Sequence, residues 1–269
     1  MTGKIGITTF DLENFDFQIQ LYSLLKENIE PDFIILHYAG SFNAGIRYYR
    51  FLKKAILQHR FKCISFIQNR ISKIDQTSKV EISLSINEKN EIAAFLKRVH
   101  IIKAGGINDK STISKIKELG NSIIICNSGI LKEKVLALPG IIFLNIHASK
   151  LPLYRGMNNV EWALYENAPV FVTVHKISGG IDEGDILYQE EIDIRNKNLT
   201  LIEDYRRYCF FKSDQVIGKA ISRLINNDIA FTEQELKQEP LLQYYVMHPI
   251  LKKRLQEKLQ LKNGSDSDE

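Results

Sequence analysis

The sequence predicts an α/β fold in which a mostly parallel sheet carries helices on its faces, followed by a small C-terminal extension. The first half alternates short apolar runs with segments of helical periodicity, which is the pattern of a parallel sheet with crossover helices. The 269 residues are 44% apolar and 25% charged, which is typical of a globular protein. This length accommodates one large domain with an appendage.

Each apolar run of four to seven residues in the first half predicts a strand, and each longer amphipathic segment between them predicts a helix. The polar, mixed residues 71–88 are expected to form a loop. The expected strands cover 5–10, 33–37, 63–67, 101–104, 122–126 and 141–146, and the expected helices cover 15–27, 44–58, 90–98, 110–119 and 132–137.

The pattern changes after Gly156. We expect a helix over 158–166, two successive strands over 170–177 and 185–192, and a long helix over 200–225 laid across the sheet. Residues 226–261 are expected to end in an amphipathic helix. The resulting division is a core over 1–195, a helical extension over 196–262 and a disordered, acidic tail over 263–269.

Composition argues against several classes of protein. Cys63, Cys126 and Cys209 are widely spaced and odd in number, which disfavours a disulfide framework and a zinc site. The net charge is +4, but no arginine-rich helix with interleaved aromatic residues is present, so no nucleic-acid partner is expected. The first residues lack the apolar core of a signal peptide, and no apolar run reaches the roughly 18 residues that span a bilayer. We therefore expect a cytoplasmic protein without a membrane partner.

The strongest functional signal lies in residues 143–156, Phe-Leu-Asn-Ile-His-Ala-Ser-Lys-Leu-Pro-Leu-Tyr-Arg-Gly. Asn145 and His147 are two residues apart at the end of an apolar strand, so their side chains project from the same face. Asp182 lies on the glycine-rich loop that follows, and an amide, an imidazole and a carboxylate suit acyl transfer. The alternative is that Asn145 and His147 only satisfy backbone groups at the strand end. His175 alternates with Val172 and Val174 and is interpreted as a structural residue.

This ordered set of motifs strongly resembles the folate-dependent formyltransferases, a family that includes glycinamide ribonucleotide, methionyl-tRNA and sugar N-formyltransferases. The resemblance runs from about residue 101 to 192, and more loosely from the N-terminus. Lys150 departs from the family, which more often has an apolar residue there. The resemblance implies the Rossmann-like formyltransferase fold. Its motifs are Asn145-Ile-His147, Ser149, Leu151-Pro152, Tyr154-Arg155-Gly156 and Asp182-Glu-Gly-Asp185.

The resemblance also implies roles for individual residues. Asn145, His147 and Asp182 fall where the family has its catalytic residues, and the formyl donor is 10-formyltetrahydrofolate, with no metal required. We expect His147 and Asp182 to lie within about 4–6 Å of each other, close enough for the carboxylate to influence the imidazole. The pterin is expected between two loops, whose residues are Gly129, Ile130 and Leu131 on one side and Gly179, Gly180 and Ile181 on the other.

The acceptor is less clearly indicated. The chain length and the segments 155–162 and 243–249 look most like the sugar N-formyltransferases, which implies a nucleotide-linked deoxysugar as acceptor and a homodimer. Two alternatives stay open: a formyltransferase acting on glycinamide ribonucleotide or methionyl-tRNA, and a folate-binding protein or formyltetrahydrofolate hydrolase. The expected acceptor pocket is lined by Tyr154, Arg155, Asn158, Asn159 and Trp162.

Overall fold

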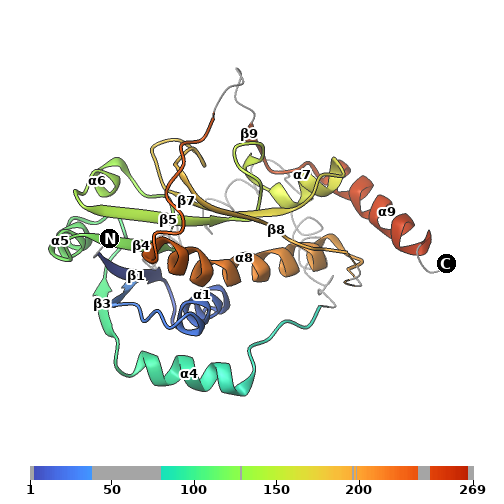
Figure 1. The fold of residues 1–269 in the computed structure, drawn as a ribbon. Coiled ribbons are helices and arrows are strands. Elements are labelled where there is room, and N and C mark those ends of the chain that lie inside the picture. Colours follow the sequence, from blue (N-terminus) through green and yellow to red (C-terminus); the bar gives the residue numbers. More distant parts are fainter. Residues whose placement is uncertain are drawn as a thin grey trace, which may run out of the picture.

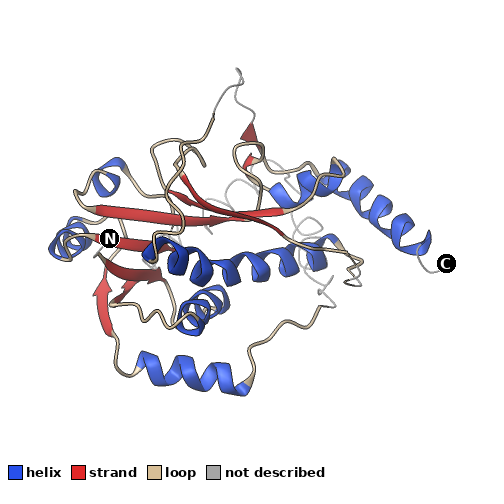
Figure 2. Cartoon of the chain, viewed as in Figure 1, coloured by secondary structure: helices blue, strands red, loops and turns tan. Residues whose placement is uncertain are grey.

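A computed structural model describes residues 3–37, 80–127, 129–195, 197, 199–235 and 243–265 of the chain. Within these residues the main sheet has seven strands in the order β3-β2-β1-β4-β5-β7-β8, with helices on both faces (Figures 1 and 2). The fold class predicted from the sequence is therefore confirmed. No helix in the described part is long and apolar enough to cross a membrane.

The first five strands along the chain are parallel, and β7 and β8 are antiparallel additions beside β5. A second, two-stranded sheet pairs β6 with β9. The strands are β1 (Lys4–Thr9), β2 (Phe33–His37), β3 (His100–Ala104), β4 (Ser122–Cys126), β5 (Ile141–His147), β6 (Arg155–Gly156), β7 (Phe171–Lys176), β8 (Ile186–Glu191) and β9 (Gln243–Tyr244).

The helices are close to those predicted, with one clear difference at α4. This helix begins at Ile86 rather than at residue 90, because Ser85 and Glu88 form a capping box that stabilises an earlier start. The described helices are α1 (Phe15–Lys26), α4 (Ile86–Leu96), α5 (Lys110–Glu118), α6 (Glu133–Leu136), α7 (Asn159–Tyr165), α8 (Ile202–Ile225) and α9 (Pro249–Ser265). The strand expected over 63–67 and the helix expected over 44–58 lie outside the described residues.

Alternation along the central strands creates two apolar layers. Ile123 and Ile125 of β4 face the layer that includes α1 and α8, whereas Ile124 between them faces α5 and α6. Side chains point to alternate faces of a strand, so a continuous apolar run is required when both faces are covered. The long helix α8 packs against α1 and against β5, β7 and β8, as the sequence predicted.

The C-terminal extension returns to the core after α8. Its β9 strand pairs with β6, and α9 then runs outward to the C-terminal end of the chain (Figure 1). Helix α9 extends to Ser265, three residues into the segment expected to be a disordered tail. Residues 266–269 are not among those described.

Candidate active site

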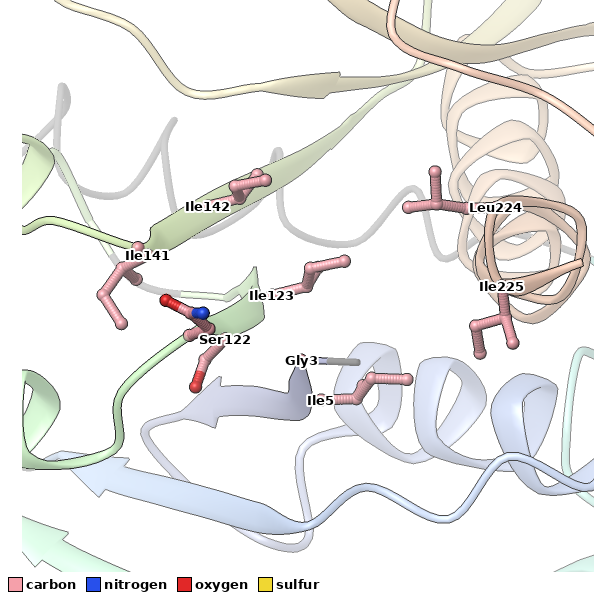
Figure 3. A pocket seen from close by; sticks show the side chains of 10 residues that line it. Gly3, Ile5, Ser122, Ile123, Ile141, Ile142, Leu224 and Ile225 are labelled. Atoms are coloured by element: carbon pink, nitrogen blue, oxygen red, sulfur yellow. The ribbon is translucent and has the colours of Figure 1, made fainter. Parts of the chain in front are cut away.

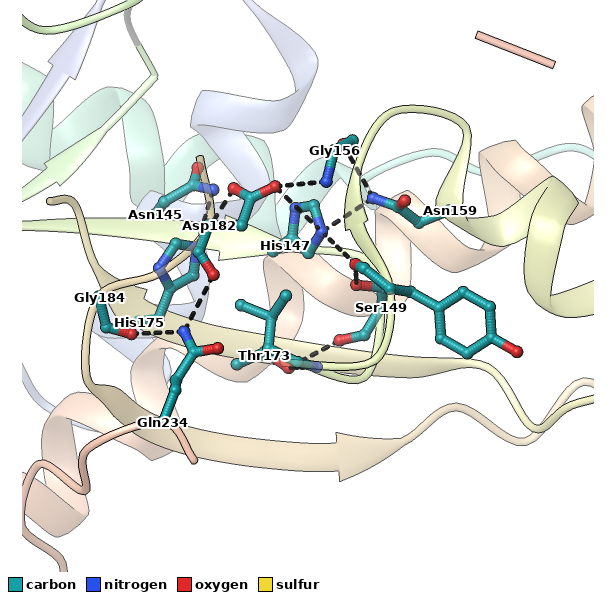
Figure 4. A network of polar contacts seen from close by, with 12 residues as sticks. Asn145, His147, Ser149, Gly156, Asn159, Thr173, His175, Asp182, Gly184 and Gln234 are labelled. Carbon is teal, nitrogen blue, oxygen red and sulfur yellow. Dashed lines mark hydrogen bonds and ion pairs between the residues drawn. The ribbon is translucent and has the colours of Figure 1, made fainter. Parts of the chain in front are cut away.

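The site lies at the carboxyl end of β5, where the buried strand presents Asn145 and His147. Strand β7 runs antiparallel beside it, and this register sets His175 opposite Asn145 and Thr173 opposite His147. Ligands of open α/β sheets bind beyond the carboxyl ends of parallel strands. The side chains at this end form the polar network drawn in Figure 4.

Asp182 completes the expected group of three. Its Oδ2 atom lies 3.6 Å from His147 Nε2, slightly closer than the expected 4–6 Å. The same oxygen accepts a hydrogen bond of 2.8 Å from the backbone N–H of Gly156. Asp182 has φ of +55°, a left-handed conformation that residues other than glycine seldom adopt. The structure thus brings Asn145, His147 and Asp182 together, as the motifs predicted.

His147 is buried and has two further neighbours. Its Nε2 atom lies 3.0 Å from the carbonyl oxygen of Tyr154 and 2.8 Å from Asn159 Nδ2. Asn159 Nδ2 also donates to the Gly156 carbonyl oxygen at 3.0 Å. These contacts hold the imidazole of His147 through its Nε2 atom, which faces the segment between β5 and α7.

His175 belongs to this network, although the sequence indicated only a structural role. Burial lowers the pKa of His175 to about 4, and repulsion from His147 adds to the lowering, so its imidazole is neutral at pH 7. Its Nδ1 lies 2.7 Å from the Lys176 carbonyl oxygen and therefore carries the proton. The unprotonated Nε2 is then free to accept the 3.2 Å hydrogen bond from Asn145 Nδ2. His175 orients the amide of Asn145.

The strand alternation that marked His175 as buried was correct, since only 2% of it is exposed. The alternation did not reveal that the hydrogen-bond partner of His175 is Asn145. The antiparallel pairing of β5 with β7 is the signal that would have revealed it, because directly paired residues have neighbouring side chains.

The loop after β4 presents an open surface next to the site. Gly129 and Ile130 are exposed, and Ile130 is 90% exposed despite its apolar side chain. Asn108 holds the loop through its side chain, which donates to the Ile130 carbonyl oxygen and accepts from the Lys132 N–H. Leu131, by contrast, is buried in the core.

The loop between β7 and β8 contains the second expected wall. Ile181 is 54% exposed, and a side chain at Gly179 would meet nothing within 4 Å. A Cβ atom at Gly180 would lie 1.9 Å from an oxygen of the Glu183 side chain, which would have to shift to make room. Exposed isoleucines on loops with unobstructed glycines at Gly129 and Gly179 suit contact with the face of a flat ring.

The side chains expected to line an acceptor pocket are held by other protein groups. The Tyr154 hydroxyl donates to Glu166 at 2.7 Å, which together with burial raises the pKa of Tyr154. Arg155 is buried and donates from Nη1 to Glu183 at 2.5 Å. Both side chains therefore contribute to the structure of the loop that follows β5.

Asn158 and Trp162 are engaged in a similar way. Asn158 Nδ2 donates to Glu161 at 2.7 Å, and Asn158 has φ of +56° at the start of α7. The Trp162 indole donates to the Tyr245 carbonyl oxygen at 2.9 Å. Trp162 thus joins α7 to the C-terminal extension.

A separate apolar cavity of about 550 Å³ lies at the opposite, amino-terminal edge of the sheet (Figure 3). Its lining has no ionisable side chain and hence no group suited to proton transfer. Nor does the described part of the chain contain a cluster of three or more His, Cys, Asp or Glu side chains arranged to hold a metal ion. The cavity is lined by Gly3, Ile5, Asn121, Ser122, Ile123, Gly140, Ile141, Ile142, Leu224 and Ile225.

Comparison with solved structures shows the same fold. The chain aligns with an N-formyltransferase from Helicobacter canadensis, solved with folinic acid and dTDP-3-aminofucose, with a TM-score of 0.54 and 17% identity over 96% of this chain and 81% of that one. It aligns with a sugar N-formyltransferase from a Shewanella species with a TM-score of 0.53 and 11% identity, over 96% and 88%.

Sequence comparison finds relatives of two kinds. The bifunctional polymyxin resistance protein ArnA of Wigglesworthia glossinidia brevipalpis is 28% identical over 172 residues, which cover 63% of this chain and 25% of that protein. The methionyl-tRNA formyltransferase of Thermotoga sp. (strain RQ2) is 38% identical over 108 residues, or 39% and 34% of the two chains. The chain thus spans about a quarter to a third of these relatives.

A family model described as formyl transferase matches residues 70–220, which is more than half of the sequence and includes Asn145, His147 and Asp182. By this match, the chain belongs to the formyl transferase family.

Proposed function

We propose that this protein is an N-formyltransferase that uses 10-formyltetrahydrofolate as donor and the amino group of a nucleotide-linked deoxysugar as acceptor. The observation that carries the proposal is the convergence of Asn145, His147 and Asp182 at the carboxyl end of β5, with His147 Nε2 3.6 Å from Asp182 Oδ2. A hydrogen-bond donor, an imidazole and a carboxylate in one place are the groups that acyl transfer to an amine requires.

The formyl donor would supply an electrophilic carbonyl carbon. As an amine attacks such a carbon, negative charge develops on the carbonyl oxygen. The Asn145 amide has a second N–H besides the one bound to His175, and this N–H can donate to that oxygen. Removing one donor of this kind typically lowers kcat by about 10²–10³-fold.

His147 acts on the negative charge of the carbonyl oxygen, and Asp182 acts on the proton of the attacking amine. In its protonated form, His147 stabilises the same negative charge, and the Asp182 carboxylate lies 3.6 Å from its Nε2 atom. Asp182 accepts the proton that the attacking amine loses, directly or through a water molecule. The bond between the formyl carbon and the folate nitrogen then breaks, and that nitrogen leaves with a proton in exchange. The N–H of Gly156 holds Asp182 Oδ2 in position for this step.

The described residues fit a folate. The exposed side chains of Ile130 and Ile181 lie on the two loops that follow β4 and β7, and neither Gly129 nor Gly179 is obstructed by neighbouring atoms. In this proposal, Gly129, Ile130, Gly179 and Ile181 contact the pterin, while Leu131 and Gly180 support the two loops from behind.

Support for a sugar acceptor comes from the fold comparison. The Helicobacter canadensis enzyme, solved with dTDP-3-aminofucose, aligns with 96% of this chain, including residues beyond the family match. We propose that residues 154–162 form the acceptor-side wall of the site. Tyr154, Arg155, Asn158 and Trp162 shape this wall, since their polar groups are already bound to protein.

The methionyl-tRNA formyltransferases among the sequence relatives favour a second candidate acceptor, the amino group of methionyl-tRNA. The two candidates differ in size and charge, and the chemistry proposed for His147 is compatible with either. Assays on the purified chain distinguish them.

The decisive experiment is a screen of nucleotide-linked amino sugars with 10-formyltetrahydrofolate, followed by mass spectrometry for a formamide product. Methionyl-tRNA, glycinamide ribonucleotide and water are tested in parallel, with Asp182→Asn as the control for contaminating activity. We expect formylation of at least one amino sugar. Transfer only to methionyl-tRNA or glycinamide ribonucleotide would refute the acceptor, and release of formate without any amine transfer would indicate a hydrolase.

A further inference from the structure

Gln234 links the C-terminal part of the chain to the loop that carries Asp182. It follows α8, in a short segment anchored by an isolated bridge between Thr232 and Ile186. Its side chain is 6% exposed. Gln234 Nε2 donates to the carbonyl oxygen of Gly184 at 2.6 Å and to that of Asp182 at 3.0 Å (Figure 4).

The chemistry of these contacts determines the orientation of the amide. Both partners are carbonyl oxygens, which only accept hydrogen bonds, so the NH2 group must face them and each of its two protons can serve one oxygen. The other amide atom, Oε1, is buried without a hydrogen-bond partner among the described residues. Burying an unpaired acceptor is unfavourable. The Gln234 side chain therefore contributes its two hydrogen bonds to the loop that contains Asp182.

The Asp182 loop needs such support. Asp182 has φ of +55°, and a residue with a Cβ atom adopts this conformation at a cost in energy. Gly156 holds the side chain of Asp182 through Oδ2, and Gln234 holds its backbone through the carbonyl oxygen. Together these contacts determine where the carboxylate lies relative to His147.

We propose that Gln234 is a positioning residue for Asp182, and that the segment after α8 thereby forms part of the catalytic machinery. Gln234 lies beyond the family match, which ends at residue 220, so the match assigns it no role. The kinetic part of this inference rests on the proposed formyl transfer, whereas its spectroscopic part does not.

The test is a double-mutant cycle with Gln234→Leu and Asp182→Asn, measured as kcat and KM for formyl transfer. Gln234→Leu should lower kcat by about 10–100-fold with little change in KM, as expected when a catalytic group moves by about 1 Å. In the Asp182→Asn background it should cause no further loss, because the effect acts through Asp182. Gln234→Met is used in the same cycle if Gln234→Leu does not fold.

Gln256→Leu is the matched control. Like Gln234, Gln256 bonds to the backbone through its amide, but it does so at the start of α8. Its Oε1 accepts from Ile202 N–H at 2.9 Å, and its Nε2 donates to the Thr200 carbonyl oxygen at 2.8 Å. The Gln256→Leu substitution should leave kcat unchanged. The inference is overturned if Gln234→Leu retains the wild-type kcat. It is also overturned if Gln234→Leu lowers kcat by the same factor in the wild-type and the Asp182→Asn backgrounds.

A substrate-free measurement separates this inference from the proposed function. The ¹H–¹⁵N signals of the His147 imidazole, assigned from their loss in His147→Gln, should shift in Gln234→Leu in the same direction as in Asp182→Asn. Gln256→Leu should leave them in place. If no amine is formylated by the wild-type protein, the proposed function fails, and unchanged His147 signals in Gln234→Leu would by themselves refute the role of Gln234.

Discussion

His147 and His175 lie on neighbouring strands, yet their surroundings give them different tasks. Both rings lie near Asp182, with His175 Nε2 3.8 Å from Oδ1 and His147 Nε2 3.6 Å from Oδ2. His175 is neutral and holds Asn145, whereas His147 contacts two polar groups that follow β5. The two rings meet edge to face with centroids 6.0 Å apart. In the proposed mechanism, His147 stabilises the negative charge of the transition state, whereas His175 only orients Asn145.

Replacing His147 by Ala should therefore lower kcat by about 10²–10⁴-fold, the usual contribution of a positioned proton-transfer group. Acceptor binding, measured by isothermal titration calorimetry, should change little, because the interaction strengthens only in the transition state. His248→Ala is a suitable control, since His248 is exposed and lies outside the site. Equal losses in kcat for both variants would contradict the assignment.

His175 should also leave a signature in stability. Its pKa falls from 6.5 to about 4 on folding, so the unfolded state binds more protons between these values. Stability should therefore decline as the pH falls from about 6.5 towards 4. His175→Gln keeps an acceptor for Asn145 but does not titrate, so urea denaturation should show a smaller decline between pH 7 and pH 5. A decline as steep as that of the wild type would contradict this explanation.

At the scale of elements, α1 and α8 pack closely enough to bury polar groups between them. The Gly218 N–H donates to Ser23 Oγ, and a Cβ atom at Gly218 would lie 1.9 Å from the Ser23 carbonyl oxygen. Nearby, Gln20 Nε2 donates to Asp214 at 2.5 Å and to Asn127 at 2.9 Å. This buried cluster connects the helix pair to the end of β4, just before the Gly129 loop.

Asp214 makes this helix pair sensitive to pH. Burial raises the pKa of Asp214 well above its ordinary value; the Gln20 hydrogen bond opposes the rise and Asp16 adds to it. A raised folded-state pKa stabilises the fold below the ordinary pKa, and this stabilisation is lost as the pH increases. Asp214→Asn should thus gain stability relative to the wild type at pH 7 but not at pH 4, in urea denaturation at both values. A uniform loss at both would show that the buried carboxyl is ionised.

The Gly129 loop offers a clean test of the proposed folate contact. Its Cβ position is free of neighbours within 4 Å and its φ is not left-handed, so Gly129→Phe should fold normally. The added ring would occupy the space proposed for the pterin, and we expect binding of folinic acid to weaken at least about tenfold, a change of about 1.4 kcal/mol. Gly129→Ala should bind almost normally. Unchanged affinity in a folded Gly129→Phe protein would exclude this loop from the folate site.

Over the whole molecule, the C-terminal extension is joined to the active-site loop at several points. Strand β9 pairs with β6, and the N–H of Met247 donates to Asn158 Oδ1. The buried Glu161 forms ion pairs with Arg206 of α8 and Lys252 of α9. Figure 1 shows α9 leaving the body of the protein from this junction. The segment after β5, which contacts both His147 and Asp182, is thus fixed by residues that are far apart in the sequence.

Gly156 is the most constrained residue at this junction. It has φ of +100°, and a Cβ atom would lie 2.2 Å from the Tyr244 carbonyl oxygen. Gly156→Ala should therefore destabilise the protein by about 1–2 kcal/mol or more, from the left-handed backbone alone. It should also lower kcat, because the Gly156 N–H holds Asp182. Urea denaturation and kinetics measure the two effects, with Gly179→Ala as the unobstructed control for stability. Wild-type stability in Gly156→Ala would show that β6 and β9 separate readily.

The sequence alone determined the α/β class, most strand and helix positions and the placement of Asn145 and His147 on one face. These features follow from local periodicity: a strand repeats every two residues and a helix every 3.6. The glycine-rich loop indicated Asp182, the motif resemblance implied a catalytic role for it, and it comes close to His147 in the structure. The predicted start of α4 was four residues late, although Ser85 and Glu88 have the sequence spacing of a capping box, which marks the start of a helix.

Only the tertiary structure decided how the three side chains are supported. His175 reaches Asn145 through an antiparallel pairing, Asn159 reaches His147 across a turn, and Gln234 reaches the Asp182 loop from 52 residues away. Asn159 was expected in the acceptor pocket rather than against His147, whereas His175 and Gln234 looked like ordinary buried or polar positions in the sequence. Their partners are set by strand register and by the return of the chain after α8, and hydrogen bonds between distant segments leave no periodic trace in a single sequence.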